Sequence, residues 1–144
     1  MSVRNILLVE DDERDVEMTL MAFRNHNLVN LVHVVRDGEE ALDYLFRRGA
    51  YEQRPPGEPC VVLLDIKLPK VSGLDVLAQV RESPEFKFLP IVLLTSSREH
   101  TDLVHAYKLG ANAFVVKPVK FQEFLAAAQK IGAFWALLNE PLQS

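Results

Sequence analysis

The sequence predicts an α/β protein with a doubly wound, five-stranded parallel sheet and helices on both faces. The first reason is a set of short, almost wholly apolar runs without alternation, which is typical of parallel strands buried on both faces. The second is that helical patterns fall between these runs, so strand and helix alternate along the chain. The length of 144 residues corresponds to one ordinary domain.

The first strand is expected at Ile6–Val9, where apolar residues follow one another without interruption. A helix is expected over 14–25, because apolar side chains recur there at helical spacing. These side chains are Val16, Leu20 and Phe23. The run Leu31–Val35 is the weakest of the predicted strands, since His33 interrupts it.

A second helix is expected over 38–47. Asp37 and Glu40 have the spacing of a capping box, in which two side chains bind backbone N–H groups at the start of a helix. The stretch from Arg47 to Pro59 is expected to stay outside helix and sheet, because it contains three prolines.

The third strand is expected at Val61–Leu64 and the fourth at Ile91–Leu94. A helix over 73–82 separates them in the prediction. Ser72 is a candidate N-cap for this helix, because its hydroxyl can accept a hydrogen bond from a free N–H of the first turn.

A further helix is expected over 98–109, with Gly110 as its stop signal. The fifth strand is expected at Ala113–Val116. The last helix is expected to begin near Lys120 and to run to about Leu138.

Composition narrows the functional classes. A net charge of −4 argues against a broad nucleic-acid surface. The single cysteine cannot form an internal disulfide, so nothing indicates an oxidising compartment. The N-terminus reaches acidic residues too soon for a signal peptide, and no later run is long enough to span a bilayer. We therefore expect a cytoplasmic protein with no direct contact to a membrane or to nucleic acid.

Polar residues follow four of the predicted strands. They are Glu10, Asp11 and Asp12 after the first strand, Asp65 after the third, Thr95 with Ser96 and Ser97 after the fourth, and Lys117 after the fifth. Ligands of such sheets bind at the carboxyl ends of the strands, so we expect these groups to converge. Clustered carboxylates suit Mg²⁺, while a hydroxyl and an ammonium suit the oxygens of a phosphoryl group on Asp65.

Each of these residues also has an ordinary explanation. An acidic cluster is often a solvated loop, Thr95 can cap the next helix, and Lys117 can be a surface lysine. Each ordinary explanation is preferred when its residue is taken alone. Four such groups at four strand ends are harder to explain in this way, because buried like charges without a counter-ion are costly.

The chain resembles the response-regulator receiver domains. The resemblance covers about residues 4–132 and predicts a single receiver domain over 1–144, with an extended C-terminal helix to about residue 138. The motifs that carry it are Val9-Glu10-Asp11-Asp12, Leu64-Asp65-Ile66-Lys67-Leu68-Pro69, Leu94-Thr95-Ser96 and Val116-Lys117-Pro118. It implies a flavodoxin-like strand order of 2-1-3-4-5. It also implies a signalling phosphoacceptor that catalyses only its own phosphorylation and dephosphorylation.

The resemblance assigns roles to individual residues. Asp65 matches the phosphoacceptor, and Thr95 with Lys117 matches the pair that senses the phosphoryl group. Phe114 matches the aromatic position that turns inward on activation. The implied Mg²⁺ ligands are Asp11, Asp65, the backbone carbonyl of Lys67, and Glu10 through water.

A narrower likeness points to the single-domain regulators that partner phytochrome-type histidine kinases. The loop from Arg47 to Pro59, Leu68-Pro69-Lys70, and Phe134-Trp135 carry it. It implies transfer from a kinase phosphohistidine and a homodimer.

The composition of the last helix also suggests a dimer, with kinase docking as the competing interpretation. One stripe at helical spacing is expected to face the core. Its residues are Phe121, Phe124, Leu125, Ala128, Ile131, Trp135 and Leu138. Apolar residues largely off that stripe are expected to form a contact surface. They are Ala126, Ala127, Ala133, Phe134, Ala136 and Leu137.

Three other functions are also compatible with the predicted architecture. One is a phosphatase that forms an aspartyl-phosphate, although Lys67 stands where that class usually carries its general acid. Another is a nucleotide- or flavin-binding domain, although acids replace the glycine-rich loop after the first strand. A third is a receiver-shaped scaffold that has lost phosphorylation.

Overall fold

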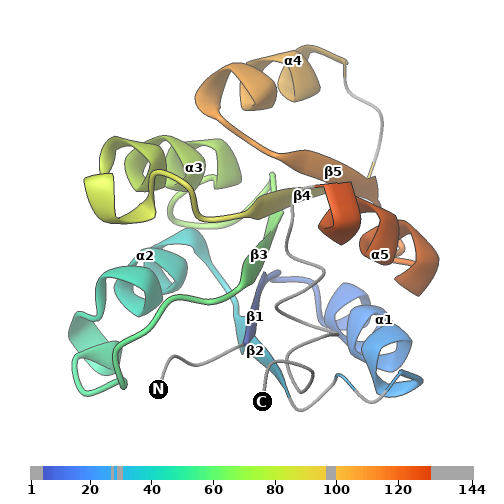
Figure 1. Cartoon of the computed structure of the whole chain (residues 1–144), viewed down its shortest axis with the longest axis horizontal. Helices are drawn as coiled ribbons and strands as arrows, with labels where there is room; N and C mark the ends of the chain where they lie inside the picture. The colour runs from blue at the N-terminus through green and yellow to red at the C-terminus, as the bar shows by residue number, and fades with distance from the viewer. Residues whose placement is uncertain (1–4, 27, 29–30, 97–99, 131–144) are drawn as a thin grey trace.

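The structure is a computed structural model that describes residues 5–26, 28, 31–96 and 100–130. Its strands and helices alternate along the chain (Figure 1). The strands are β1 (Ile6–Val9), β2 (Val32–Val35), β3 (Val61–Asp65), β4 (Ile91–Thr95) and β5 (Ala113–Val116). The helices are α1 (Glu13–Arg24), α2 (Gly38–Phe46), α3 (Gly73–Glu82), α4 (His100–Leu109) and α5 (Phe121–Lys130).

The five strands form one sheet in the order β2-β1-β3-β4-β5, and every pairing is parallel. This confirms the predicted fold class and the flavodoxin-like strand order. The register places Val9 beside Leu64 and Thr95 beside Val116. The carboxyl ends of β1, β3, β4 and β5 therefore lie along one edge of the sheet.

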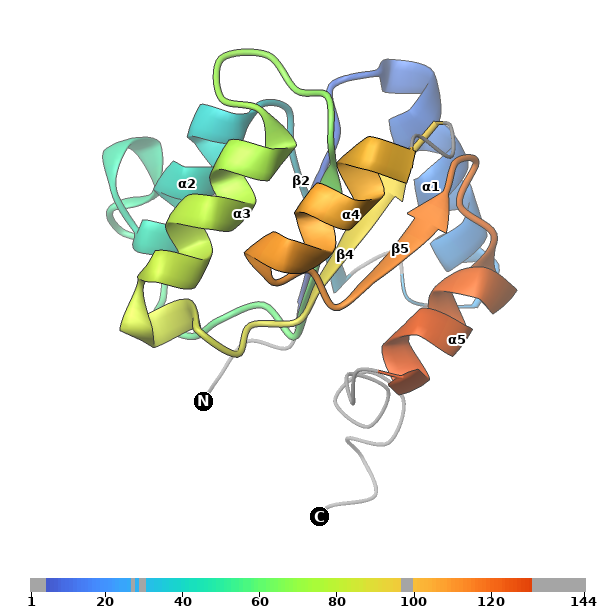
Figure 2. The same cartoon turned by 90° about the horizontal axis from the view of Figure 1, so that it is seen from above.

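Helices cover both faces of the sheet, with α1 and α5 on one side and α2, α3 and α4 on the other (Figures 1 and 2). Alternate residues of each strand divide between two cores. Leu7 and Val9 join the core under α2, α3 and α4, whereas Ile6 and Leu8 join the core under α1 and α5. Burial of each such side chain contributes roughly 2 kcal/mol. The strands suit this double covering because they are apolar apart from His33, Asp65 and Thr95.

The predicted helix caps form, with one difference. The Asp37 carboxylate accepts the N–H of Glu40 at 2.7 Å, and the Ser72 hydroxyl accepts the N–H of Asp75 at 3.2 Å. In a full capping box Glu40 would bind the N–H of Asp37, but it binds the N–H of Arg36 at 2.9 Å. The Glu40 side chain therefore accepts its hydrogen bond one residue closer to the N-terminus than in a full capping box.

The prediction that residues 47–59 contain no helix is wrong for one turn, because Gly49–Tyr51 forms a 3₁₀ helix. Arg54 holds this segment against α2, since its Nε donates to the Tyr44 carbonyl at 2.9 Å and its guanidinium lies 4.4 Å from the Tyr44 ring centroid. The prolines come after this turn and do not prevent it. A second 3₁₀ turn, Pro84–Phe86, was not predicted.

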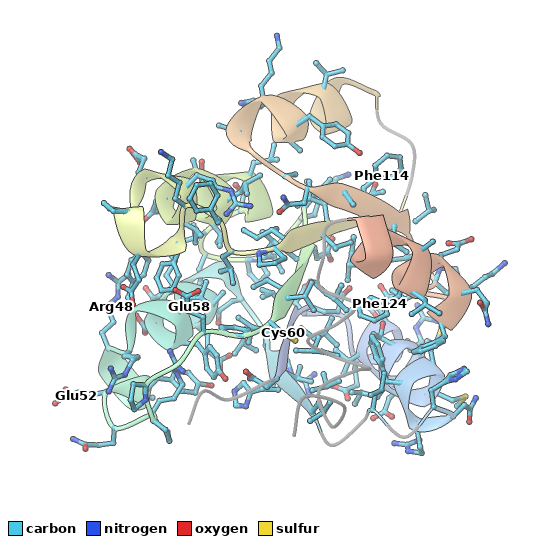
Figure 3. All side chains as sticks on the ribbon, in the orientation of Figure 1. Arg48, Glu52, Glu58, Cys60, Phe114 and Phe124 are labelled. Atoms are coloured by element: carbon cyan, nitrogen blue, oxygen red, sulfur yellow. The ribbon has the colours of Figure 1, made fainter. Side chains whose placement is uncertain are left out.

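The described part of α5 corrects one prediction about its faces. Phe124 is fully buried between α5 and α1, as expected (Figure 3). Ala127 is also buried, although the sequence placed it off the core stripe. The helix is therefore covered over a wider arc than the stripe implied. The predicted continuation to Leu138, with Trp135, lies outside the described residues.

Within the described ranges, no helix combines the length and the apolar character needed to cross a membrane.

Candidate functional site

Five of the predicted polar residues, Glu10, Asp11, Asp65, Thr95 and Lys117, meet at the carboxyl edge of the sheet, while Ser97 lies outside the described residues. Glu10 directly follows β1 and Lys117 directly follows β5, while Asp65 and Thr95 are the last residues of their strands. In the parallel register, Asp65 pairs with Leu94 and Thr95 pairs with Val116, so the ends of neighbouring strands are level. The fold thus brings together residues that are far apart in the sequence.

Three carboxylates form the acidic part of this edge. Glu10, Asp11 and Asp65 each offer an oxygen, and these oxygens all lie within 4.8 Å of one another. Glu10 is fully buried and Asp65 almost so, whereas Asp11 is exposed. The Asp12 carboxylate caps α1 instead, accepting the N–H groups of Arg14 and Asp15.

The pKa of Glu10 is raised to about 7, chiefly by burial and also by the hydrogen bond and the charge of Asp65. A hydrogen bond from Lys117 and one from the Asp12 backbone oppose this rise. The carboxyl group of Glu10 therefore takes up a proton more readily than that of an exposed glutamate. A cation at this edge would favour its charged form.

Lys117 provides the positive charge of the site. Its Nζ atom lies 3.0 Å from a carboxylate oxygen of each of Glu10, Asp15 and Asp65. Burial lowers the pKa of Lys117, but hydrogen bonds to Asp15, Asp65 and Glu10 outweigh it, so the net pKa lies above its ordinary value. The ammonium is therefore a fixed positive charge at any physiological pH.

Asp15 is the site residue that the sequence did not predict. It lies in the first turn of α1, where an acid is common because it interacts favourably with the helix dipole. Nothing in its spacing points to a lysine 102 positions later. The contact arises only in the folded chain, where the Lys117 side chain reaches across the carboxyl edge of the sheet to α1.

The predicted switch residues lie on neighbouring strands. Thr95 is buried at the end of β4, and its carbonyl accepts the N–H of Lys117 at 2.7 Å. Phe114 lies on β5 near α4 (Figure 3). Its side chain is 37% exposed, and its ring centroid lies 6.2 Å from that of Tyr107 in an edge-on arrangement. The aromatic ring is therefore turned outward.

The loop between β3 and α3 borders the site. The N–H of Lys67 donates to Oδ1 of Asp65 at 3.3 Å, and the Lys67 side chain is exposed. The N–H of Gly73 donates to the Ile66 carbonyl at 2.8 Å, which folds the loop back on itself. A Cβ atom on Gly73 would lie 2.1 Å from the Asp65 carbonyl oxygen, so only glycine allows this close approach.

The arrangement combines a buried carboxylate, an oxygen-only cluster that suits a hard divalent cation, and a fixed ammonium. Both Asp65 oxygens accept a hydrogen bond, one from Lys67 and one from Lys117. These are the components needed to hold and neutralise a transferred anionic group.

Comparisons with known proteins agree with this geometry. The family model described as the response regulator receiver domain matches residues 6–129. The response regulator Rcp1 of Synechocystis sp. is 33% identical over 130 residues, which cover 90% of this chain and 87% of Rcp1.

Solved structures give the same result. The bacteriophytochrome response regulator AtBRR is 58% identical, with a TM-score of 0.87 over 97% of this chain and all of that chain. RtBRR, another bacteriophytochrome response regulator, is 57% identical, with a TM-score of 0.85 over 96% of this chain and 84% of that chain. The Mn²⁺-bound form of Rcp1 is 32% identical, with a TM-score of 0.75 over 94% of this chain and 96% of that chain.

Proposed function

The chain belongs to the response regulator receiver domain family of two-component systems, and on this premise we propose that Asp65 accepts a phosphoryl group from a sensor histidine kinase. One observation carries the proposal. The buried Asp65 carboxylate lies 3.0 Å from the Lys117 ammonium and beside the carboxylates of Glu10 and Asp11. A nucleophile, an anion-binding charge and a cation-binding group are thus adjacent.

The transfer step follows from these positions. A carboxylate oxygen of Asp65 attacks the phosphorus of a phosphohistidine, and the bond from phosphorus to the imidazole nitrogen breaks with its electron pair returning to the ring. Negative charge builds up on the phosphoryl oxygens during the step. Lys117 and the hydroxyl of Thr95 are proposed to bind these oxygens, because both groups donate hydrogen bonds from the same edge of the sheet.

The donor set also fits Mg²⁺. Two buried or nearly buried carboxylates lie within 4.8 Å of a third, and oxygen ligands of this kind are those that Mg²⁺ prefers. We propose that Asp11, Asp65, the Lys67 carbonyl and, through water, Glu10 hold the ion. When bound, Mg²⁺ supplies positive charge that neutralises the phosphoryl oxygens. The structure of Rcp1 in an Mn²⁺-bound form supports such a site.

A conformational switch is the proposed output. Thr95 at the end of β4 is expected to bind the new phosphoryl group, and the shift of its hydroxyl makes room for an aromatic side chain. Phe114, now turned outward beside Tyr107, is the candidate to fill that space. Packed interfaces of this kind tend to move between two states.

The proposed donor is a phytochrome-type histidine kinase. Support comes from the similarity to AtBRR and RtBRR, both bacteriophytochrome response regulators, at 58% and 57% identity. Mixing the chain with autophosphorylated candidate kinases and comparing transfer rates tests the assignment. A kinase of another class that transfers faster than every phytochrome-type kinase would contradict it.

We also propose that the chain is one cytoplasmic receiver domain over residues 1–144 and that it forms a homodimer. A groove along α4, β5 and α5 offers an apolar surface for a second copy. It is lined by Tyr107, Ala113, Phe114, Val115, Val116, Glu123, Ala126 and Ala127. Sedimentation at micromolar concentration tests the dimer, and a monomer throughout that range would favour kinase docking on this face.

Phosphorylation by acetyl phosphate with Mg²⁺ tests the central proposal. One phosphoryl group should be added, as measured by intact mass, and Asp65→Asn should remove the labelling. Asp75→Asn is the matched control, because Asp75 is an exposed acid on α3. Equal labelling of Asp65→Asn and the parent would show that Asp65 is not the acceptor.

The same assay separates the other functions when released phosphate is also measured and nucleotide and flavin binding are tested in parallel. A phosphatase would release phosphate from the donor over many turnovers, and a nucleotide- or flavin-binding domain would bind its ligand without acquiring a label. A scaffold that has lost phosphorylation would show neither behaviour.

A further inference from the structure

The Lys117 ammonium is fully occupied by acids from three elements. An ammonium has three N–H donors, and three carboxylate oxygens lie 3.0 Å from Nζ. Glu10 follows β1, Asp65 ends β3, and Asp15 belongs to α1. The lysine side chain is only 10% exposed, so water contributes little to holding it in place.

Asp15 differs from the other two partners. Glu10 and Asp65 belong to the group of carboxylates close enough to share a metal ion, and Asp15 does not. Any cation bound by that group would compete with Lys117 for Glu10 and Asp65. The hydrogen bond to Asp15 is the one that such competition leaves intact.

The position of Asp15 in a helix N-terminus does not account for this contact. Asp12 is the N-cap and already accepts the N–H groups of Arg14 and Asp15. Acids are favourable anywhere in a first helical turn, and Glu13 occupies this turn as well. That preference explains why position 15 carries an acid. It does not explain why the Asp15 carboxylate lies 3.0 Å from the ammonium of Lys117, which follows β5.

We propose that Asp15 is a positioning residue that acts through Lys117. It shares the ammonium with Glu10 and Asp65 and keeps the lysine at the site when those two carboxylates are engaged by a metal ion or by phosphorylation. The inference rests on the proposed function, because Lys117 needs to remain near Asp65 only if it is to bind a phosphoryl group there.

Loss of the Asp15 charge should weaken Mg²⁺ binding. Without Asp15, the lysine relies on Glu10 and Asp65 alone, so Mg²⁺ must displace it from its remaining partners. We expect Asp15→Asn to reduce Mg²⁺ affinity about fivefold, a modest effect because the Asp15 side chain is 28% exposed. Asp15→Glu restores a carboxylate and should recover most of the affinity.

The first experiment is an NMR titration of the full chain with Mg²⁺ alone, using backbone amide shifts both to confirm folding and to measure affinity. Glu17→Gln is the matched control, because it removes a carboxylate exposed on the same helix. The titration is repeated in a Lys117→Met background, where Asp15→Asn should change affinity less than about twofold. A fivefold loss that persists in this background would overturn the proposal, since it would be a direct effect of charge on the metal.

The second experiment observes the Lys117 ammonium by ¹⁵N–¹H NMR. In the parent, its resonance should remain visible after Mg²⁺ is added, because Asp15 still holds it. In Asp15→Asn, the Lys117 ammonium resonance should disappear when Mg²⁺ is added, because the released ammonium exchanges its protons rapidly with water. An unchanged ammonium signal in Asp15→Asn would overturn the proposal.

Both readouts use unphosphorylated protein, so they are independent of the labelling of Asp65. If acetyl phosphate labels the parent while Asp15→Asn behaves as the parent does in both readouts, the positioning role is wrong and the proposed function stands. If the parent is not labelled, the proposed function fails, whatever the result for Asp15.

Discussion

The Nζ atom of Lys117 lies 3.0 Å from the Oδ2 atom of Asp65, and the side chains are only 10% and 7% exposed. Two opposite charges at this distance and with this little solvent interact much more strongly than a surface pair. The lysine therefore acts as the counter-ion of the acidic edge in the structure described. Any divalent cation that binds the same carboxylates must compete with it.

Removal of this competitor should strengthen metal binding. We expect Lys117→Met to raise Mg²⁺ affinity about tenfold, equivalent to about 1.4 kcal/mol, because Glu10 and Asp65 lose their resident cation. Calorimetric titration measures the change. Lys120→Met, which alters an exposed lysine nearby, should bind Mg²⁺ as the parent does. A weaker Mg²⁺ affinity in Lys117→Met would refute competition.

Removal of Asp11, the exposed acid of the cluster, should have the opposite effect and weaken metal binding. Asp11 has an oxygen within 4.8 Å of those of Glu10 and Asp65, and its side chain is accessible to an incoming ion. We expect Asp11→Ala to weaken Mg²⁺ binding at least about tenfold, or about 1.4 kcal/mol. Glu17→Ala is a suitable control on the exposed face of α1. An unchanged Mg²⁺ titration would exclude Asp11 from the site.

Arg81 should contribute to stability, because it connects three segments of the chain. Its guanidinium donates to the carbonyls of Gly110 and Phe86 and to the side chain of Asn112, each at 2.9 Å. We expect Arg81→Met to lower the free energy of unfolding by about 2–3 kcal/mol, since partly buried acceptors lose a charged donor. Urea denaturation measures this. Arg24→Met, at the exposed end of α1, should cost less than about 0.5 kcal/mol.

Most of the fold could be predicted because its three central strands, β1, β3 and β4, are buried on both faces. Runs such as Val61–Leu64 contain no polar residue, and this pattern combined with intervening helices allows few architectures. The convergence of Glu10, Asp65 and Lys117 follows from the same premise, since parallel strands end at one edge.

The parts that could not be predicted depend on tertiary packing. The partnership of Asp15 with Lys117 requires the lysine side chain to reach across the sheet edge to α1, and a local sequence pattern contains no information on that arrangement. The burial of Ala127 depends on how α5 is rotated against the sheet. The turn Gly49–Tyr51 is held partly by Arg54, whose contacts reach back to α2.

The partly buried position of His33 predicts that the stability of the folded chain depends on pH. Burial lowers the pKa of His33, the charge of Glu40 opposes this, and the charge of Arg54 adds to it. Its ring also stacks on Tyr44, and its Nε2 lies 3.2 Å from the Tyr51 hydroxyl. The unfolded chain therefore binds a proton more readily than the folded chain at pH values just below the ordinary value of about 6.5. Stability should fall as the pH drops below that value.

Substitution of His33 should remove this part of the pH dependence. His33→Phe keeps an aromatic ring against Tyr44 but cannot take up a proton. Thermal unfolding is measured between pH 5 and pH 8. On lowering the pH, the stability of this variant should fall less than that of the parent, over a range of about one unit on either side of pH 6. His26→Phe, at an exposed histidine, is the control. Parallel profiles for His33→Phe and the parent would contradict the expected role of His33.

Phe114 should turn inward when a phosphoryl mimic occupies the site. Its ring is 37% exposed beside Tyr107, and Lys117 and Thr95 lie at the ends of the same pair of strands. Chains labelled with fluorophenylalanine allow the ring to be followed by ¹⁹F NMR. Addition of beryllofluoride and Mg²⁺ should move the resonance of residue 114. The resonance of Phe88, which is 85% exposed on a loop before β4, should stay in place.

The coupling to Thr95 decides whether this movement is a switch. Thr95→Ala removes the hydroxyl proposed to bind the phosphoryl group, while the fold of β4 is kept by its apolar residues. Beryllofluoride bound to this variant, verified by its own ¹⁹F signal, should leave the resonance of residue 114 close to its unliganded position. If the ring moves in Thr95→Ala as far as in the parent, Phe114 responds to the occupied site by a route that does not include Thr95. The shift of the Thr95 hydroxyl would then not be the cause, and Lys117, directly after β5, would remain as the group that transmits the signal.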